Sequence, residues 1–222
     1  MTEFTTWRSL VDGAEIAAIP DSEDLHSAYF ADNLELNEND DVIEWQDQGD
    51  DSLDLTPDNN PPKFLDDPPR VEFEIGEEQD LSTSFSDLPQ PYSIFLVVDS
   101  DDNSSSDTDY FFSEESGSGN VALHTDDDSV YAMRAMDKVS GGNPDADEHI
   151  LVGRFDGDDS ELRLDGSVLA TGDVGGNDLN EHRLNRRDSG SDFRLKSVMV
   201  YATVDSEVVE NVEEFLDKRF KT

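Results

Sequence analysis

Three glutamates within residues 72–77 (EFEIGE) are the side chains of this chain whose spacing best suits acid–base chemistry. Side chains alternate between the two faces of a strand, so Glu72 and Glu74 would share one face. Paired carboxylates are what retaining glycoside hydrolysis requires, one as nucleophile and one as general acid. However, 55 of the 222 residues are Asp or Glu, so short acidic patterns arise by chance. We therefore expect a solvated strand face and a protein that is not an enzyme.

Metal binding has less support from the sequence. Residues 99–109 (DSDDNSSSDTD) resemble a calcium loop in composition, but the EF-hand form requires Gly at its sixth position and Glu at its twelfth, where this chain has Ser104 and Tyr110. The acidic run at 126–128 is explained by surface solvation, and weak cation association there stays an alternative. The chain has no cysteine, so disulfides and thiolate ligands are excluded. We expect no metal and no cofactor.

The histidines show no spacing typical of a shared metal ion. Ser and Asp residues surround each of them, so the sequence neither supports nor excludes a catalytic triad. We expect each to lie in a loop or at a strand edge. The four are His26, His124, His149 and His182.

Carbohydrate binding would need an exposed aromatic ring for stacking, with polar side chains around it. Trp45 lies in the strand-like VIEWQ, which predicts a core position instead. A basic island before the last long strand would contact either acidic groups or anionic sugars, and we favour ion pairs within or between subunits. The carbohydrate-binding residues stay unknown at this stage. The tyrosine candidates are Tyr92, Tyr110, Tyr131 and Tyr201, and the basic island is Arg183, Arg186 and Arg187.

Acidic residues dominate the composition. The formal net charge is −40, with 15 Lys and Arg, and the acids are spread from end to end. Such self-repulsion opposes a compact state, but at about 1 M salt the Debye length falls to about 3 Å and most of it is screened. Leu, Ile, Val and Phe together exceed the roughly 20% below which disorder is expected. We therefore expect a folded protein from a halophilic system. No basic stripe is present, which argues against nucleic acid as a partner.

The start of the chain carries no targeting signal. Its first residues, MTEFTTWRSL, lack the basic and apolar regions of a secretory signal. No apolar run approaches the roughly 20 residues of a membrane helix. We expect synthesis in the cytoplasm and no membrane insertion.

From residue 24 onward the pattern predicts strands. Residues 71–75 (VEFEI) alternate between apolar and acidic, whereas residues 93–99 (SIFLVVD) form a continuous apolar run typical of a strand buried on both faces. Asp165-Gly166 between two strand-like runs is a strong hairpin signal. Many short strands with long acidic loops favour a sandwich or barrel. Further strands are expected at 110–113, 121–125, 130–136, 150–155, 161–164, 168–171 and 193–203.

The two ends of the chain differ from the strand region. An apolar stripe from Val208 to Phe220, with Asp205 or Ser206 as cap, predicts a C-terminal helix. Near the N-terminus, Phe4, Trp7 and later apolar residues fit helical spacing and Pro20 ends the segment; it either packs on the domain or acts as a docking arm. We therefore divide the chain into a leader, 1–24, and a domain, 25–222.

The order of motifs resembles the concanavalin A-like lectin/laminin G-like jelly-roll domains of phage and virus structural proteins. There a segment of the form V..W.DQSG precedes a proline-bearing link and a strand of the form V.F.G. Here residues 42–50 (VIEWQDQGD), prolines at 61, 62, 68 and 69, and residues 71–75 follow in that order. ELRLDGSVLATG resembles the family's strand–DG–strand hairpin. Gly49 replaces the family's Ser-Gly, and Ile75-Gly76 its Asp-Gly. The resemblance covers about residues 25–220 and implies an all-β concanavalin A-like jelly-roll β-sandwich with a short C-terminal helix.

This resemblance implies a non-enzymatic structural protein on the virion of a halophilic, haloarchaeal virus. It would be a capsid decoration, turret or tail-fibre component, assembled in the host cytoplasm and displayed on the virion surface. Its expected partners are other virion proteins through the N-terminal segment, further copies in a homo-oligomer, and a host cell-surface glycan. One alternative is a secreted or cell-surface glycan-binding module, which the missing signal sequence disfavours.

A second alternative is a glucanase-like glycoside hydrolase using Glu72 and Glu77. Some glucanases of the same superfold carry their acids as E-x-D-x-x-E on one strand, and residues 72–77 resemble that motif. Glu74 stands where the motif has Asp, which weakens the match.

Overall fold

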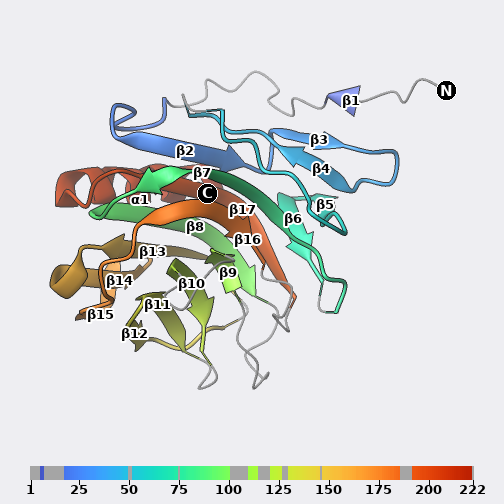
Figure 1. Ribbon diagram of the computed structural model, residues 1–222. Coiled ribbons are helices and arrows are strands. Elements are labelled where there is room, and N and C mark those ends of the chain that lie inside the picture. Colours follow the sequence, from blue (N-terminus) through green and yellow to red (C-terminus); the bar gives the residue numbers. More distant parts are fainter. Residues whose placement is uncertain are drawn as a thin grey trace.

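The described residues form two large β-sheets packed face to face, with a smaller sheet at one end and a single α-helix (Figure 1). The structure is a computed structural model that describes residues 6–7, 18–49, 52–74, 76–100, 110–114, 121–126, 130–145, 147–185 and 192–221. In the eight-stranded sheet the order is β15 (Ser167–Gly172), β14 (Ser160–Leu164), β13 (His149–Phe155), β8 (Tyr92–Ser100), β17 (Phe193–Tyr201), β6 (Pro69–Phe73) and β5 (Lys63–Asp66), and β2 (Leu25–Phe30) also pairs with β17.

The second large sheet has six strands. Its order is β12 (Lys138–Gly141), β11 (Tyr131–Ala135), β10 (Val121–Thr125), β9 (Tyr110–Ser113), β16 (Leu179–Leu184) and β7 (Leu81–Leu88). The small sheet consists of β1 (Thr6–Trp7), β3 (Leu34–Leu36) and β4 (Val42–Trp45). The helices are η1 (Gly157–Asp159), a 3-10 turn, and α1 (Ser206–Phe220).

The apolar run of β8 is buried on both faces, as the sequence predicts. Leu96 and Val98 belong to the core between the two large sheets, whereas Phe95 and Val97 belong to a second core under α1. Because the sides of a strand alternate, a strand between two apolar layers has no polar face. The eight-stranded sheet is therefore covered on its inner face by the other sheet and on its outer face by the helix.

The helix α1 forms where its apolar stripe and cap predict it. The side chain of Asp205 accepts a hydrogen bond from the backbone N–H of Glu207 at 2.8 Å, which satisfies one of the free donors of the first turn. Val209, Val212 and Leu216 are buried against the outer face of the eight-stranded sheet. No helix in the described part of the chain is long and apolar enough to cross a membrane.

The segment around Trp45 and Asp47 supports the sandwich. The Trp45 side chain is fully buried, and its indole N–H donates to the carbonyl of Phe30 at 2.9 Å. The Asp47 carboxylate accepts backbone N–H groups from Ala28, Gly49 and Leu53 at 2.9, 2.8 and 3.1 Å. One aspartate thus joins β2 to the loop after β4. The predicted core position of Trp45 is confirmed.

Several strands were not predicted, among them β7, β12 and β16. The last of these changes the expected environment of the basic island, because Arg183 lies within β16 and not in a loop. Most of the leader, with its helical spacing, lies outside the described residues; Thr6 and Trp7 pair with Leu36 and Glu35 of β3. The division at residue 24 and the docking role of the leader stay predictions.

Candidate functional site

The glutamates with hydrolase-like spacing are not brought together on one strand face. Glu72 lies on β6, and its carboxylate accepts a hydrogen bond from Arg194 Nε at 2.9 Å. Since β6 ends at Phe73, Glu74 and Glu77 lie after the strand and are exposed. The expected alternation therefore stops before the motif is complete, and of the glucanase-like pair only Glu72 lies on the strand, where Arg194 binds its carboxylate. The prediction of a shared strand face was wrong for that reason.

The tyrosine candidates for sugar stacking are reduced to one. Tyr92, Tyr131 and Tyr201 are at most 1% exposed, so their rings are not available to a ligand. Tyr110, the first residue of β9, is partly exposed. Burial could not be read from the four tyrosines' local sequence, because each stands in a strand of similar pattern.

The basic island does not offer Arg183 to a ligand. Arg183 is 2% exposed and pairs with Asp80, with Asp58 (Nη2–Oδ2, 2.9 Å) and with Glu181 (Nη2–Oε1, 2.9 Å). This agrees with the favoured interpretation of ion pairing within the protein. Arg186 and Arg187 lie outside the described residues.

Two histidines have internal roles, which the sequence did not predict. His182 is fully buried beside His26, and its Nδ1 lies 3.1 Å from the Tyr29 hydroxyl; burial holds the pKa of His182 well below its usual value. His149 lies between two carboxylates, with Nδ1 2.7 Å from Asp165 and Nε2 2.8 Å from Asp145. Burial lowers the pKa of His149, but these two hydrogen bonds outweigh it and raise the pKa overall.

No described residues form a metal site. Among the residues whose positions are given, no group of three His, Asp or Glu side chains could hold a metal ion. Of the calcium-like residues 99–109, Asp99 and Ser100 end β8, with Asp99 paired to Arg70 and Arg194, and residues 101–109 lie outside the described residues. Of the acidic run at 126–128 only Asp126 is described, and it pairs with Lys138.

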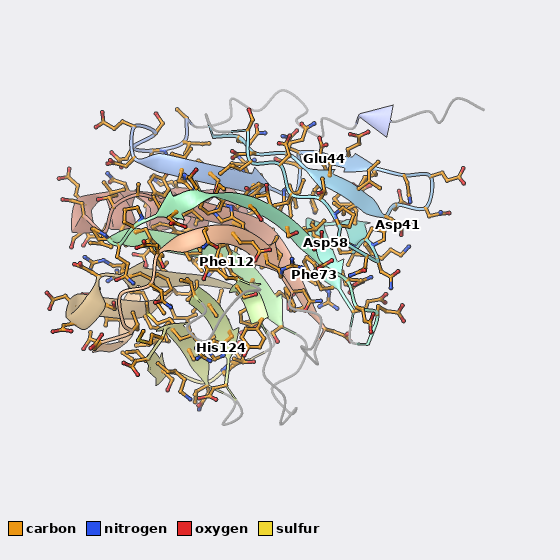
Figure 2. The ribbon with its side chains drawn as sticks, in the orientation of Figure 1. Asp41, Glu44, Asp58, Phe73, Phe112 and His124 are labelled. Carbon is orange, nitrogen blue, oxygen red and sulfur yellow. The ribbon has the colours of Figure 1, made fainter. Side chains whose placement is uncertain are left out.

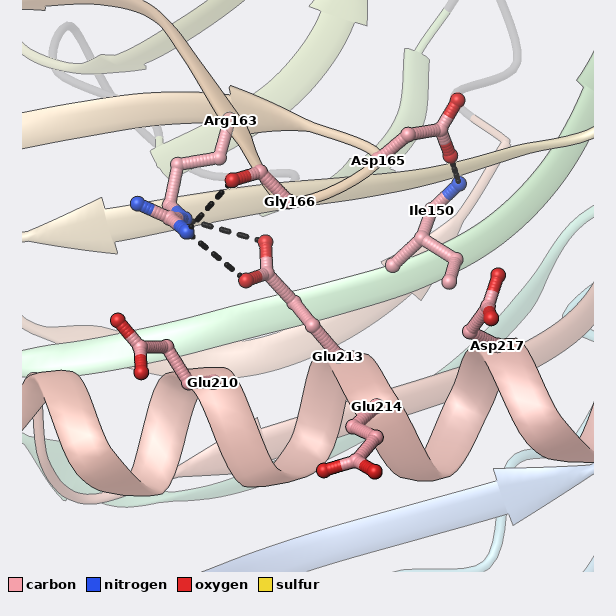
Figure 3. A pocket seen from close by; sticks show the side chains of 8 residues that line it. All are labelled: Ile150, Arg163, Asp165, Gly166, Glu210, Glu213, Glu214 and Asp217. Atoms are coloured by element: carbon pink, nitrogen blue, oxygen red, sulfur yellow. Dashed lines mark hydrogen bonds and ion pairs between the residues drawn. The ribbon is translucent and has the colours of Figure 1, made fainter.

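A pocket of about 410 Å³ lies between α1 and the hairpin of β14 and β15 (Figure 3). Arg163 crosses it and binds Glu213 through two hydrogen bonds, Nε–Oε1 at 3.1 Å and Nη2–Oε2 at 2.9 Å. This pair uses the only basic side chain of the lining, and the other charged residues there are acidic. The pocket is therefore negative and disfavours anionic ligands. Its lining is Ile150, Arg163, Asp165, Gly166, Glu210, Glu213, Glu214 and Asp217.

A second candidate lies on the outer face of the six-stranded sheet, and we call Tyr110, His124 and Arg134 the Arg134 patch. Ala122 pairs with Arg134, and His124 pairs with Ala132, across β10 and β11. Because alternate residues share a face, His124 and Arg134 point away from the core residues of the same strands and lie diagonally to each other. Figure 2 shows His124 among β9–β12, at the end of the molecule away from β2.

His124 offers a hydrogen-bond acceptor that is not in use. Its Nδ1 lies 2.8 Å from the Thr125 carbonyl, which can only accept, so Nδ1 carries the proton and Nε2 carries a lone pair. Nε2 is buried and has no hydrogen-bond partner, and the residue is 4% exposed. Burial holds the pKa of His124 below its usual value, and the nearby Arg134 and Lys138 lower it further. The Tyr110 ring stacks on the imidazole, with ring centres 5.2 Å apart.

Arg134 is the exception among the cations of this acidic protein. It is partly exposed, its Nε is buried without an acceptor, and within the described residues no carboxylate pairs with it. The remaining Lys and Arg of the described ranges all contact a carboxylate: Lys63, Arg70, Lys138, Arg154, Arg163, Arg183, Arg194, Lys196, Lys218, Arg219 and Lys221.

The Arg134 patch therefore combines three groups that can recognise a sugar. A guanidinium donates hydrogen bonds in a planar fork, an imidazole nitrogen accepts one, and a tyrosine ring offers an apolar face. Of these residues, the sequence had singled out Tyr110 as a stacking candidate and His124 as one of four scattered histidines. Arg134 was missed because it lies inside a predicted strand and its lack of a partner appears only in three dimensions.

The fold matches known structures, although no protein-family model and no curated protein matches the chain. Trypanosoma rangeli sialidase in complex with sialic acid matches with a TM-score of 0.62 at 13% identity, over 92% of this chain and 34% of that one. Botulinum neurotoxin type C, whose uptake by cells depends on two ganglioside molecules, matches with a TM-score of 0.66 at 8% identity, over 88% of this chain and 52% of that one. The botulinum neurotoxin serotype C1 binding domain gives 0.64 at 9%, over 81% and 53%.

These matches confirm the predicted fold, a concanavalin A-like jelly-roll β-sandwich with a short C-terminal helix. The chain spans about a third of the sialidase chains and about half of the neurotoxin chains. The prediction that the protein is not an enzyme is corrected, because sialidases, which are enzymes, are among the structures that it resembles. At these identities the likeness establishes the fold and leaves activity open.

Proposed function

We propose that this chain is a glycan-binding module and that the Arg134 patch contacts the glycan. The observation that carries the proposal is Arg134 itself, the one cation of the described chain without a carboxylate, in a protein of net charge −40. Next to it, His124 Nε2 is a buried acceptor without a partner, and Tyr110 is a partly exposed ring. Sugars present hydroxyl groups and apolar ring faces, which these groups complement.

The position of the patch supports this proposal. The patch lies on the face of the six-stranded sheet that points away from the core between the sheets, where Arg134 and Tyr110 are partly exposed and His124 is buried. β10 and β11 pair in regular register, and the pairing of β10 with β9 shifts between Leu123 and His124. Groups held by paired strands keep their mutual geometry, which lowers the entropy lost on binding. The related fold of a ganglioside-dependent neurotoxin and of a sialidase holding sialic acid is in keeping with a sugar ligand.

The sialidase and neurotoxin structures support sugar binding and lend no support to a virion role. The alternative of a secreted or cell-surface glycan-binding module is therefore closer to these findings than the virion protein that the sequence suggested. Location, oligomeric state and the halophilic source stay predictions.

A panel of immobilised glycans tests the function. Wild-type protein in about 1 M NaCl, where long-range charge repulsion is screened, should bind a subset of the panel. Tyr110→Ala and Arg134→Gln should reduce that binding, since each removes one contact group. Lys218→Gln is the matched control, because it removes one positive charge from an exposed ion pair on α1, away from the sheet. Binding that all three variants retain, or an absence of binding to every glycan, would contradict the proposal.

A further inference from the structure

We infer that the Arg134 patch selects a sugar that carries a carboxylate, with Arg134 binding the carboxylate, His124 Nε2 accepting from a sugar hydroxyl, and Tyr110 stacking on the sugar ring. This inference rests on the proposed function and adds the chemical class of the ligand. Sialic and uronic acids share this chemistry.

The charge balance around Arg134 is the first step of the argument. Lys138 on β12 lies opposite Arg134 on β11 in the strand register. Lys138 forms an ion pair with Asp126, so the charges of Lys138 and Asp126 compensate each other. Arg134 then keeps an uncompensated positive charge. With 55 acidic residues available in the chain, a carboxylate of the protein could have occupied this position, as it does beside the other described cations. A ligand carboxylate would fill the same role.

The hydrogen-bonding demand of Arg134 points the same way. Its Nε–H is buried and has no acceptor, and an unsatisfied buried donor is unfavourable. A guanidinium meets a carboxylate through two parallel hydrogen bonds, which a single sugar hydroxyl cannot supply. A carboxylate therefore satisfies the donor and neutralises the charge at once.

The neighbouring groups fit the rest of an acidic sugar. His124 Nε2 has no proton to donate and can only accept, so it matches a hydroxyl and would repel a carboxylate oxygen. This separates the roles of the two side chains: the charged group of the ligand lies at Arg134, and a hydroxyl lies at His124. The Tyr110 ring, stacked on His124, is left to contact an apolar ring face.

Titration calorimetry in about 1 M NaCl tests the class with four probes: a sialyl-oligosaccharide, its methyl ester, a uronic acid oligosaccharide and a neutral oligosaccharide of equal length. The wild-type protein should bind the acids about 10- to 100-fold more tightly than the ester or the neutral sugar, the range expected for hydrogen bonds to a charged group. Tighter binding of either the sialyl-oligosaccharide or the uronic acid oligosaccharide shows which of these two sugar acids the site prefers. Arg134→Gln should bind acid and ester equally, because the coupling between the guanidinium and the carboxylate is lost.

The control variants distinguish a failure of the ligand class, an acidic sugar, from a failure of glycan binding itself. Arg134→Lys retains the charge without the fork and should recover part of the preference, and Lys218→Gln should recover all of it. Thermal unfolding of each variant shows whether it is folded. Equal binding of acid and ester by the wild-type protein would overturn the ligand class and leave glycan binding intact. Acid selectivity that persists in Arg134→Gln would assign the carboxylate to another site and would also overturn the inference.

Discussion

Asp47 provides a direct test of what the loop after β4 contributes to stability. Its carboxylate accepts backbone N–H groups from Ala28, Gly49 and Leu53. A hydrogen bond to a charged group contributes about 1.5–3 kcal/mol. The three contributions are not additive, and the released groups are only partly buried, so water replaces part of what is lost. We therefore expect Asp47→Ala to lower the free energy of unfolding by about 3 kcal/mol.

Asp47→Asn should cause a smaller loss of stability than Asp47→Ala. The amide keeps one oxygen for Ala28 and Gly49 but turns an N–H₂ group toward the Leu53 N–H, so we expect a loss of about 1–2 kcal/mol. Each variant also removes one negative charge from a chain of −40, which is itself stabilising. Asp178→Asn, at an exposed residue, measures that contribution alone. Urea unfolding in about 1 M NaCl gives the three values; an Asp47→Ala variant within about 0.5 kcal/mol of the Asp178→Asn control would refute the reasoning.

Three further outcomes are expected. Because the pKa of His149 is raised in the folded state, its ion pairs stabilise the fold below about pH 6.5 and progressively less as the pH rises through the folded-state pKa. The difference in free energy of unfolding between wild type and His149→Gln, measured by urea unfolding, should therefore shrink from about pH 6 to about pH 8. Gly153→Ala would place a Cβ 2.8 Å from Leu123 Cδ2 between the sheets and should cost about 1–3 kcal/mol by the same assay; an unchanged midpoint would contradict this packing. Lowering NaCl from about 1 M to about 0.1 M should unfold the protein, and a melting temperature indifferent to salt would remove the argument from charge.

Local pattern predicted several strands from their apolar residues. β9 and β10 occupy the predicted residues, and Asp165-Gly166 forms the hairpin turn with both residues at positive φ. The polar strands were missed for a physical reason. In β16 (LNEHRL), His182 lies in the core with its Nδ1 beside the Tyr29 hydroxyl, and Arg183 is buried on the other face, where it pairs with Asp80. A strand stabilised in this way has no local apolar signal.

The same limit applies to the candidate site. The sequence could nominate Tyr110 by residue type, but its three competitors were removed only by their burial in the core. Arg134 carries no local sign of its role. The alternation of Tyr131 to Ala135 places it opposite the apolar side chains, which indicates an outward position and nothing about its partners. An unpaired charge is a property of the surroundings, and those are assembled from β9, β10, β11 and β12.

The position of β17 in its sheet has a consequence for how the chain is made. β17 lies between β8 and β6 and also pairs with β2, near the opposite end of the sequence. During translation from the N-terminus, the edges of these earlier strands stay open until residues 193–201 leave the ribosome. Sheets closed by such distant contacts fold slowly, and open edges invite pairing with other chains. The dense negative charge would then act before folding is complete, by keeping nascent chains apart.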